Sequence, residues 1–149
     1  TDWIDFDSPD AYRHASERAA ELDRELLQIR RQMQALVQSF KKQWPQRPRP
    51  IYPGIHISGR ERAPVIRWRL GGTPGHRQSW LTLTSDAVAR HFEHQAVPHA
   101  IRRAWIDVDR RAQRLNVRAS IVAAERRVLR AYLEHLTDLD DLEKTWSSD

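Results

Sequence analysis

The sequence predicts an α+β fold, in which two long antiparallel helices form a coiled-coil-like hairpin with a small β meander and a short helix inserted between them. Three features support this class: an apolar seam with heptad spacing near each end of the chain, a proline-rich stretch after the first seam, and three short β-type runs separated by turn residues. At 149 residues the chain suits a single domain with one modest core. We therefore expect one domain over residues 1–149.

The first long helix is predicted over residues 8–43. Ser8, Pro9 and Asp10 suit a helix start, as an N-cap, a first-turn proline and an acidic residue near the positive end of the helix dipole. Apolar residues then recur at alternating spacings of four and three until Pro45, which is typical of a coiled-coil seam. This first seam comprises Ala15, Ala19, Leu22, Leu26, Ile29, Met33, Leu36 and Phe40.

The second long helix is predicted over residues 99–136 and is followed by an acidic tail over residues 137–149. Its seam shows the same alternating spacing, which only Arg126 interrupts. We expect Arg126 to pair with an acidic residue of the first helix, such as Asp23 or Glu25, or to mark a place where the helices meet a partner. The second seam comprises Ile101, Trp105, Val108, Ala112, Leu115, Ala119, Val122, Arg126, Leu129, Leu133 and Leu136.

The two seams are expected to bury each other in an antiparallel hairpin, because neither helix would stay monomeric in water with its apolar stripe exposed. Two registers fit the pattern: one brings Ile29 near Ala119, and the other brings Leu22 near Ala119. In both, alanines of one seam face larger residues of the other, which favours pairing within one chain. A swapped or coiled-coil dimer is the alternative. The residues expected in one shared core are Leu26, Ile29, Leu115 and Val122.

The stretch between the helices has a different composition. Prolines exclude helix from the linker predicted over residues 44–54. Three short apolar runs then predict a three-stranded antiparallel β meander within residues 55–84, with strands at 55–57, 65–70 and 79–84. Ser85 and Asp86 suit the start of a short helix over residues 86–97. The tryptophans expected in the core are Trp68, Trp80 and Trp105.

The charge of the chain is unevenly distributed. The formal net charge is +5, but acidic residues gather at both ends, so residues 11–136 carry 24 basic against 11 acidic residues, a net charge of +13. Only three of the 25 basic residues are lysines, and arginine suits phosphate oxygens and base edges better than lysine does. This balance predicts association with a polyanion.

The densest basic stretch surrounds the predicted meander and is the candidate nucleic-acid site. Strand alternation predicts that Arg67 and Arg69 share one face of the middle strand, with Trp68 on the other. A ribbon that carries arginines can lie along a phosphate backbone or in a major groove. The alternative is a solvated face whose arginines keep the sheet from aggregating. The candidate residues are Lys41, Lys42, Arg47, Arg49, Arg60, Arg62, Arg67, Arg69 and Arg77.

Other features of the sequence predict neither catalysis nor cofactor binding. There is no glycine-rich phosphate loop, serine-nucleophile elbow or paired-carboxylate arrangement. His91 and His94 share the short helix without a third ligand, which argues against a metal site. The arginines of the last helix are interpreted mainly as its solvated face. We therefore expect no enzymatic activity, no metal and no cofactor.

The expected location is the cytoplasm. The chain has no cysteine, no run of eighteen apolar residues and no signal-peptide pattern. We therefore expect neither disulfides nor contact with a membrane.

One family has a similar order of elements. The features concerned are the Ile66-Arg67-Trp68 strand, the aromatic-containing helix after it and the Ile101-Arg102-Arg103 start of the last helix, within roughly residues 50–136. In these features the chain resembles the MobI-type accessory proteins of integrative conjugative elements. The resemblance implies a role beside DNA and a relaxase in initiating conjugative transfer at the origin of transfer, and it carries over no active-site residue.

The functional prediction is a non-enzymatic, DNA-associated accessory factor, acting in the initiation of conjugative transfer of a bacterial mobile element. Its expected partners are DNA and a relaxase or another transfer protein, and a homodimer is left open. The alternative is a protein-interaction module, such as a small inhibitor or an assembly adaptor, that acts through its helical hairpin.

Overall fold

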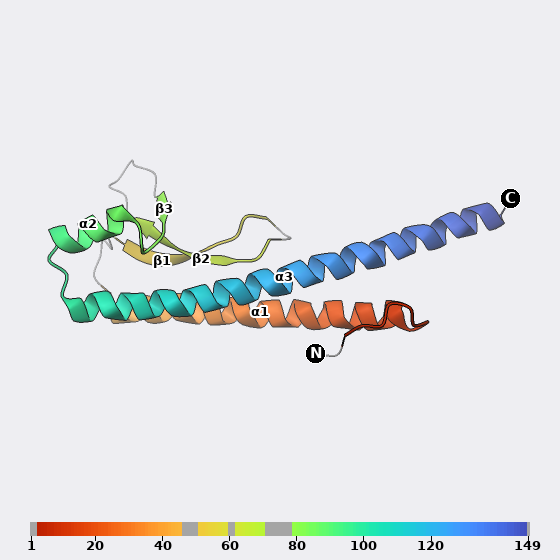
Figure 1. Cartoon of the computed structure of the whole chain (residues 1–149), viewed down its shortest axis with the longest axis horizontal. Helices are drawn as coiled ribbons and strands as arrows, with labels where there is room; N and C mark the ends of the chain where they lie inside the picture. The colour runs from red at the N-terminus through yellow and green to blue at the C-terminus, as the bar shows by residue number, and fades with distance from the viewer. Residues whose placement is uncertain (1–2, 46–50, 60–61, 71–78, 149) are drawn as a thin grey trace. The chain divides into compact units, whose positions relative to one another are not determined.

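The computed structural model describes residues 3–45, 51–59, 62–70 and 79–148. The elements in chain order are α1 (Ala11–Gln43), β1 (Ile51–His56), β2 (Val65–Leu70), β3 (Ser79–Leu81), α2 (Asp86–His94) and α3 (His99–Ser147), shown in Figure 1. The predicted α+β class is confirmed, with α1 packed against α3 and a three-stranded antiparallel sheet between them in the chain.

The chain divides into two compact units. Unit 1 comprises Thr1–Gln28 and Ile121–Asp149, and unit 2 comprises Ile29–Ser120. Each unit contains a stretch of α1 and a stretch of α3. The single domain expected from the sequence stays a prediction.

In unit 1 the seams of α1 and α3 are largely buried, although Leu26, Leu133 and Leu136 are half-buried. Leu22 of α1 and Val122 and Leu129 of α3 are among its core residues. Beside this core, Asp23 accepts hydrogen bonds from Arg126 (3.1 Å) and from Arg130 (2.7 Å). The predicted pairing of Arg126 with Asp23 is confirmed. The charge of Arg126, the one cation in the seam of α3, is therefore paired within the chain.

The same polar contacts decide the register of the helices. Asp23 follows Leu22 by one residue and bonds to Arg126, which places Leu22 opposite Arg126 in unit 1. In unit 2, Arg118 donates a hydrogen bond of 3.3 Å to Gln32. Both contacts fit the register that brings Ile29 near Ala119 and exclude the one that brings Leu22 near Ala119.

The described helix ends differ from the predicted ones by local chemistry. α1 begins at Ala11, because the Asp10 N–H bonds to the Ser8 hydroxyl and Ser8 to Asp10 form a turn before the helix. α2 ends at His94, and Ala96 has a left-handed φ of 48°, which a helix does not accommodate. α3 continues to Ser147 through most of the predicted acidic tail, since neither glycine nor proline interrupts it.

The sheet of unit 2 has the order β1-β2-β3, as expected for a meander. β1 begins at Ile51, four residues before the predicted strand, so the linker ends earlier than residue 54. The prolines of this stretch had predicted a linker instead of a strand. β1 nevertheless tolerates Pro53, because it is an edge strand and one of its edges makes no hydrogen bonds to another strand. β3 is shorter than predicted and ends at Leu81.

An aromatic cluster joins the sheet to the helices of unit 2. Phe40 of α1 contacts Trp68 of β2 at 5.5 Å and Trp105 of α3 at 5.6 Å between ring centroids. Trp68 and Trp105 stack on each other at 5.9 Å, and Phe92 of α2 packs on Trp105 at 5.5 Å. Trp44 contacts Phe40 at 4.7 Å. These rings form the centre of the core around the inner face of the sheet.

Two polar side chains of α3 position the central strand. Asp109 accepts a hydrogen bond of 2.9 Å from the indole nitrogen of the buried Trp68. Asn116 accepts one from the Ile66 N–H (2.8 Å) and donates another to the Ile66 carbonyl (3.0 Å). β3 pairs only with residues 68–70 of β2, so the Asn116 amide supplies at Ile66 the two bonds that a longer strand would make.

Of the four residues expected in one shared core, Leu26, Ile29, Leu115 and Val122, two have the expected burial. Ile29 and Val122 are buried, but Leu26 and Leu115 are half-buried. Leu115 lies beside Ala35 and Ser39 of α1, which are too small to cover it. Small residues next to the seam leave a hollow there.

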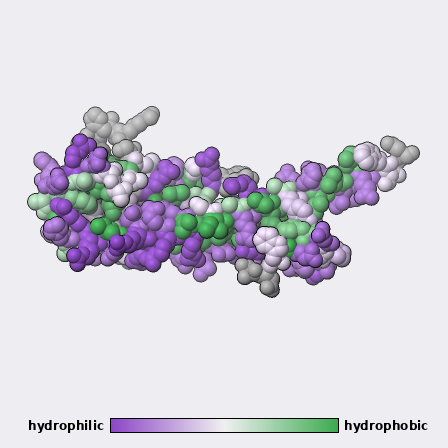
Figure 2. Space-filling model, in the orientation of Figure 1, coloured by the Kyte–Doolittle hydropathy of each residue, from purple (hydrophilic) through white to green (hydrophobic). Residues whose placement is uncertain are grey.

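The end of α3 is exposed. Residues 138–148 are all solvent-exposed, and Figure 1 shows this end of α3 extending past the start of α1 within unit 1. Figure 2 shows hydrophobic surface along it. Its exposed apolar side chains include Leu139, Leu142 and Trp146.

We predict that Phe40→Ala destabilises the protein by about 3 to 5 kcal/mol, because it empties the centre of the aromatic cluster. Urea unfolding measures the change. Leu27→Ala on α1 is the control, since Leu27 is half exposed and its loss should change stability by about 0.5 kcal/mol or less. Equal losses for the two variants would contradict the described core.

We also predict that Asn116→Asp destabilises the protein by about 1 to 3 kcal/mol at neutral pH. The carboxylate retains an acceptor for the Ile66 N–H but has no donor for the Ile66 carbonyl, and its charge repels that oxygen. Ser120→Ala, an exposed change on the same helix, is the control in the same unfolding measurement. A stability equal to that of the parent would show that the amide does not hold the strand.

Candidate nucleic-acid interface

The register of the sheet determines which side chains share a face, because directly opposite residues in antiparallel strands point to the same side. Trp68 lies opposite Pro53 and Leu81 on the inner face, toward the helices. The outer face comprises Tyr52, Gly54 and His56 of β1, Val65, Arg67 and Arg69 of β2, and Trp80 of β3. The predicted separation of Arg67 and Arg69 from Trp68 is therefore confirmed.

Trp80 is the central side chain of this outer face. The guanidinium of Arg69 lies 4.1 Å from the centroid of its ring, a cation–π contact. The imidazole of His56 approaches the same ring at 5.2 Å, edge to face. A Cβ at Gly54 would lie 3.5 Å from the ring, an ordinary contact distance, so the indole packs over this position of β1. Residues of all three strands thus meet at Trp80.

The expected burial of the three tryptophans is correct for two of them. Trp68 and Trp105 are buried, whereas Trp80 is half-buried on the outer face. Trp80 and Leu81 are adjacent apolar residues, so alternation alone allows either to face the core. Pairing with β2 decides the matter, since Leu81 lies opposite Trp68 and Trp80 lies opposite Arg69.

The described candidate cations fall into two groups. Arg67 is exposed on the outer face, and Arg62 is exposed before β2. Lys41 and Lys42 lie in the last turn of α1, in the helical layer that covers the inner face, so they do not share the outer face with Arg67. The candidates that lie outside the described residues are Arg47, Arg49, Arg60 and Arg77.

The strands of the sheet carry no acidic residue. β1, β2 and β3 contain no aspartate or glutamate. Asp109 and Asn116, which accept hydrogen bonds from Trp68 and Ile66, belong to α3 on the inner side. Among the strand residues, the outer face therefore offers arginines and aromatic rings.

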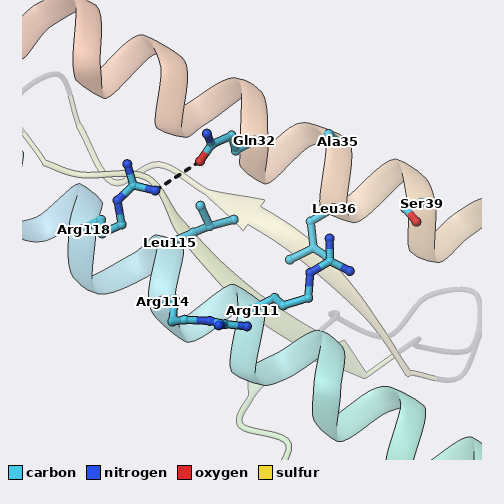
Figure 3. A pocket seen from close by; sticks show the side chains of 8 residues that line it. All are labelled: Gln32, Ala35, Leu36, Ser39, Arg111, Arg114, Leu115 and Arg118. Atoms are coloured by element: carbon cyan, nitrogen blue, oxygen red, sulfur yellow. Dashed lines mark hydrogen bonds between the residues drawn. The ribbon is translucent and has the colours of Figure 1, made fainter.

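A second basic surface lies on the helices of unit 2. A hollow of about 580 Å³ is lined by Gln32, Ala35, Leu36, Ser39, Arg111, Arg114, Leu115 and Arg118 (Figure 3). Arg118 is held by its bond to Gln32. Arg111 and Arg114 are exposed, and neither has an ion-pair partner among the described residues. Lys42 lines an adjoining hollow with Ala35 and Ser39.

The two basic surfaces lie on different sides of unit 2. Trp105, Asp109 and Asn116 of α3 meet the sheet, whereas Arg111 and Arg114 line the hollow. At about 100° of rotation per residue, these two sets point to different sides of one helix. Figure 3 shows the strands behind both helices when the hollow faces the viewer.

The hollow is not among the sequence-predicted candidates, because Arg111, Arg114 and Arg118 were expected on the solvated face of a helix. The signal that would have found the hollow is the pair of small residues Ala35 and Ser39 beside the first seam, since they leave the groove between the helices open.

Several other arginines of α3 have structural contacts. Arg102 donates to the carbonyls of Val97 (2.8 Å) and Phe92 (2.9 Å) and so fixes the turn between α2 and α3. Arg110 pairs with Asp107 at 3.2 Å. Much of the positive charge of this helix is therefore engaged within the chain.

The described side chains were also compared with sites of other kinds. In the part of the chain that the structure describes, no three His, Asp or Glu residues are grouped to hold a metal ion. None of the described helices has the length and apolar character of a membrane span. No protein-family model, curated protein or solved structure matches the chain, so its own geometry carries the functional argument.

Proposed function

We propose that the protein is a DNA-associated accessory factor that binds through the outer face of its sheet. The observation that carries this proposal is the meeting of Arg67, Arg69 and Trp80 on one face of the sheet, where Arg67 is exposed to solvent. Guanidinium groups bind phosphate oxygens, and aromatic rings stack on bases. Tyr52 and His56 extend the same face across β1.

Single-stranded DNA suits this face better than duplex DNA does. Bases of a duplex are stacked on each other and show only their edges, whereas unpaired bases can stack on an aromatic side chain. Trp80 is half-buried and is held in place by Arg69, so little side-chain freedom is lost on binding. The hollow of α1 and α3 has cations but no aromatic ring among its lining residues, so it offers contacts to phosphate alone.

The resemblance to MobI-type proteins gives this proposal a biological setting. A factor that binds single strands would act where a relaxase opens DNA at the origin of transfer. The relaxase and the role in conjugative transfer stay predictions that rest on the resemblance.

A protein-interaction module is the alternative function, as a small inhibitor or an assembly adaptor. The exposed apolar side chains of α3, such as Ile121 and Val128, favour it. The two functions respond differently to salt. Binding through phosphates weakens steeply between about 50 and 200 mM salt, whereas an adaptor shows no DNA affinity above background at any salt concentration.

We predict that Arg67→Ala weakens binding to a single-stranded oligonucleotide and lowers the salt slope by about one unit, because one phosphate contact is lost. Thermal stability should change by about 0.5 kcal/mol or less, since Arg67 is exposed. Fluorescence anisotropy at several salt concentrations measures both affinity and slope.

The comparison variant combines Arg111→Ala with Arg114→Ala in the hollow, and it should weaken binding less than Arg67→Ala does. A larger effect of this pair would move the site from the sheet to the helices. Parental binding by both variants would favour the interaction module.

We predict that Trp80→Ala weakens single-strand binding by about 1 to 3 kcal/mol per stacked base, while Trp80→Phe retains most of the affinity. If Trp80→Phe keeps its affinity, the ring and not the indole N–H carries the binding, because phenylalanine can stack on a base but has no N–H to donate. Duplex and single-stranded oligonucleotides of one sequence are compared in the same assay. If Trp80→Ala left both affinities unchanged, stacking on this face would be excluded.

A further inference from the structure

α3 has a second apolar stripe that does not face α1. Within unit 1 its apolar members are Ile121, Ala124, Val128, Ala131, Leu139, Leu142 and Trp146, and His135 occupies one polar position of the same row. The spacings are three or four throughout, so these residues form one row along the helix. The seam that faces α1 runs through Val122 and Leu129 instead.

The large members of this stripe are strongly exposed. Ile121 is 63%, Val128 65% and Trp146 69% exposed, whereas Val122 and Leu129 of the first seam are 6% and 5% exposed. Single exposed apolar residues are ordinary, but a continuous row of them marks an interaction surface. α3 therefore has one buried and one exposed apolar face in unit 1.

The last part of the stripe also lacks support from α1. The register places Ala11, the first residue of α1, near residue 137 of α3, so Leu139 to Trp146 extend beyond it. A helical segment of this length is marginal in water unless its apolar side is packed. The segment is nevertheless helical to Ser147, and a partner that covered its apolar side would stabilise it.

The spacing of the stripe is self-complementary in the antiparallel direction. Two copies aligned in this way bring Ile121 to Trp146, Ala124 to Leu142, Val128 to Leu139 and Ala131 to His135. Small residues meet larger ones in two of the four layers, as in the alternating packing of helical cores. An antiparallel pair of identical helices needs such a symmetric row of residues.

The charges beside the stripe favour the same arrangement. Arg127, Asp138 and Asp141 flank one side of it, and the antiparallel alignment brings Arg127 of one copy to Asp138 and Asp141 of the other. On the other side the alignment brings Glu125 to Glu143 of the other copy, where Arg18 of the same chain balances the charge of Glu125. Residues 134–143 hold five acids, so this surface does not suit a nucleic acid.

We infer that a second copy of this chain covers the stripe, forming an antiparallel α3–α3 dimer that buries Val128 of each copy against Leu139 of the other. The inference is independent of the proposed DNA binding, which uses the sheet. The dimer axis passes between residues 131 and 135 of the two copies. Each copy contributes the same surface, so the contact closes on itself and does not extend into a fibre.

Sedimentation equilibrium of the whole chain tests the association. The expected mass is twice the 17.5 kDa of one chain. Val128→Lys combined with Leu139→Lys should yield the single-chain mass, because both lysines would be desolvated at the dimer contact. Leu27→Lys, a change of the same kind at the half-exposed Leu27 of α1, should leave the dimer intact. Circular dichroism checks that helix content is retained in all variants.

Cysteine pairing tests the orientation, because the natural chain contains no cysteine. A mixture of Val128→Cys and Leu139→Cys chains should form an intermolecular disulfide on mild oxidation, and neither chain alone should do so. Parallel helices in register would instead link Val128→Cys to itself. A disulfide in that single variant, or a single-chain mass for the parent at all concentrations, overturns the inference.

Charge reversal supplies a second measure of the same contact. Arg127→Glu should raise the dimer dissociation constant about fivefold or more, because the symmetric dimer holds the contact twice. Adding Asp138→Arg and Asp141→Arg to that variant should restore the affinity. A failure of this rescue would contradict the antiparallel alignment, even if the protein is a dimer.

Discussion

The burial of Trp68 determines which face of the sheet meets water. Its ring packs on Phe40 and Trp105, and its indole nitrogen bonds to Asp109 of α3. Because side chains alternate along β2, this burial turns Arg67 and Arg69 outward. The candidate interface is therefore a consequence of core packing, and a rotation of β2 by one residue would replace its arginines with apolar side chains.

The basic character of the chain serves two physical purposes. Arg126 and Arg130 meet Asp23 across the helices of unit 1, and Arg102 closes the turn before α3. These arginines stabilise the fold, and their charges are partly compensated within it. Arg67 on the outer face of the sheet is exposed to solvent, and the strands themselves contain no acidic residue. The proposal of polyanion binding therefore depends on where each arginine lies and what surrounds it. The total number of arginines does not distinguish the two roles.

α3 is longer than α1 and differs from it in character. α1 has one apolar side, which meets α3 in both units. α3 meets α1 through one side and exposes a second apolar row through Ile121 and Val128. A helix with two apolar sides is stable when both are covered, and a hairpin covers only one of them. The proposed contact with DNA and the inferred contact between copies therefore use different elements, the sheet and the second row of α3.

Heptad spacing and strand alternation are local properties, so the sequence by itself determined the two long helices and placed Arg67 and Arg69 on the face of β2 opposite Trp68. It favoured antiparallel pairing of the helices within one chain and left a dimer as the alternative. It allowed two registers, and the contact of Asp23 with Arg126 decided between them only once the helices were paired. Local rules predicted a linker at Pro53, whereas the structure has this proline in β1, at the edge of the sheet, where a missing N–H is tolerated. They also allowed Trp80 or Leu81 to face the core, and pairing with β2 turned Trp80 to the surface. Tertiary structure decided these points because each depends on which distant residue lies opposite, and no local pattern contains that information.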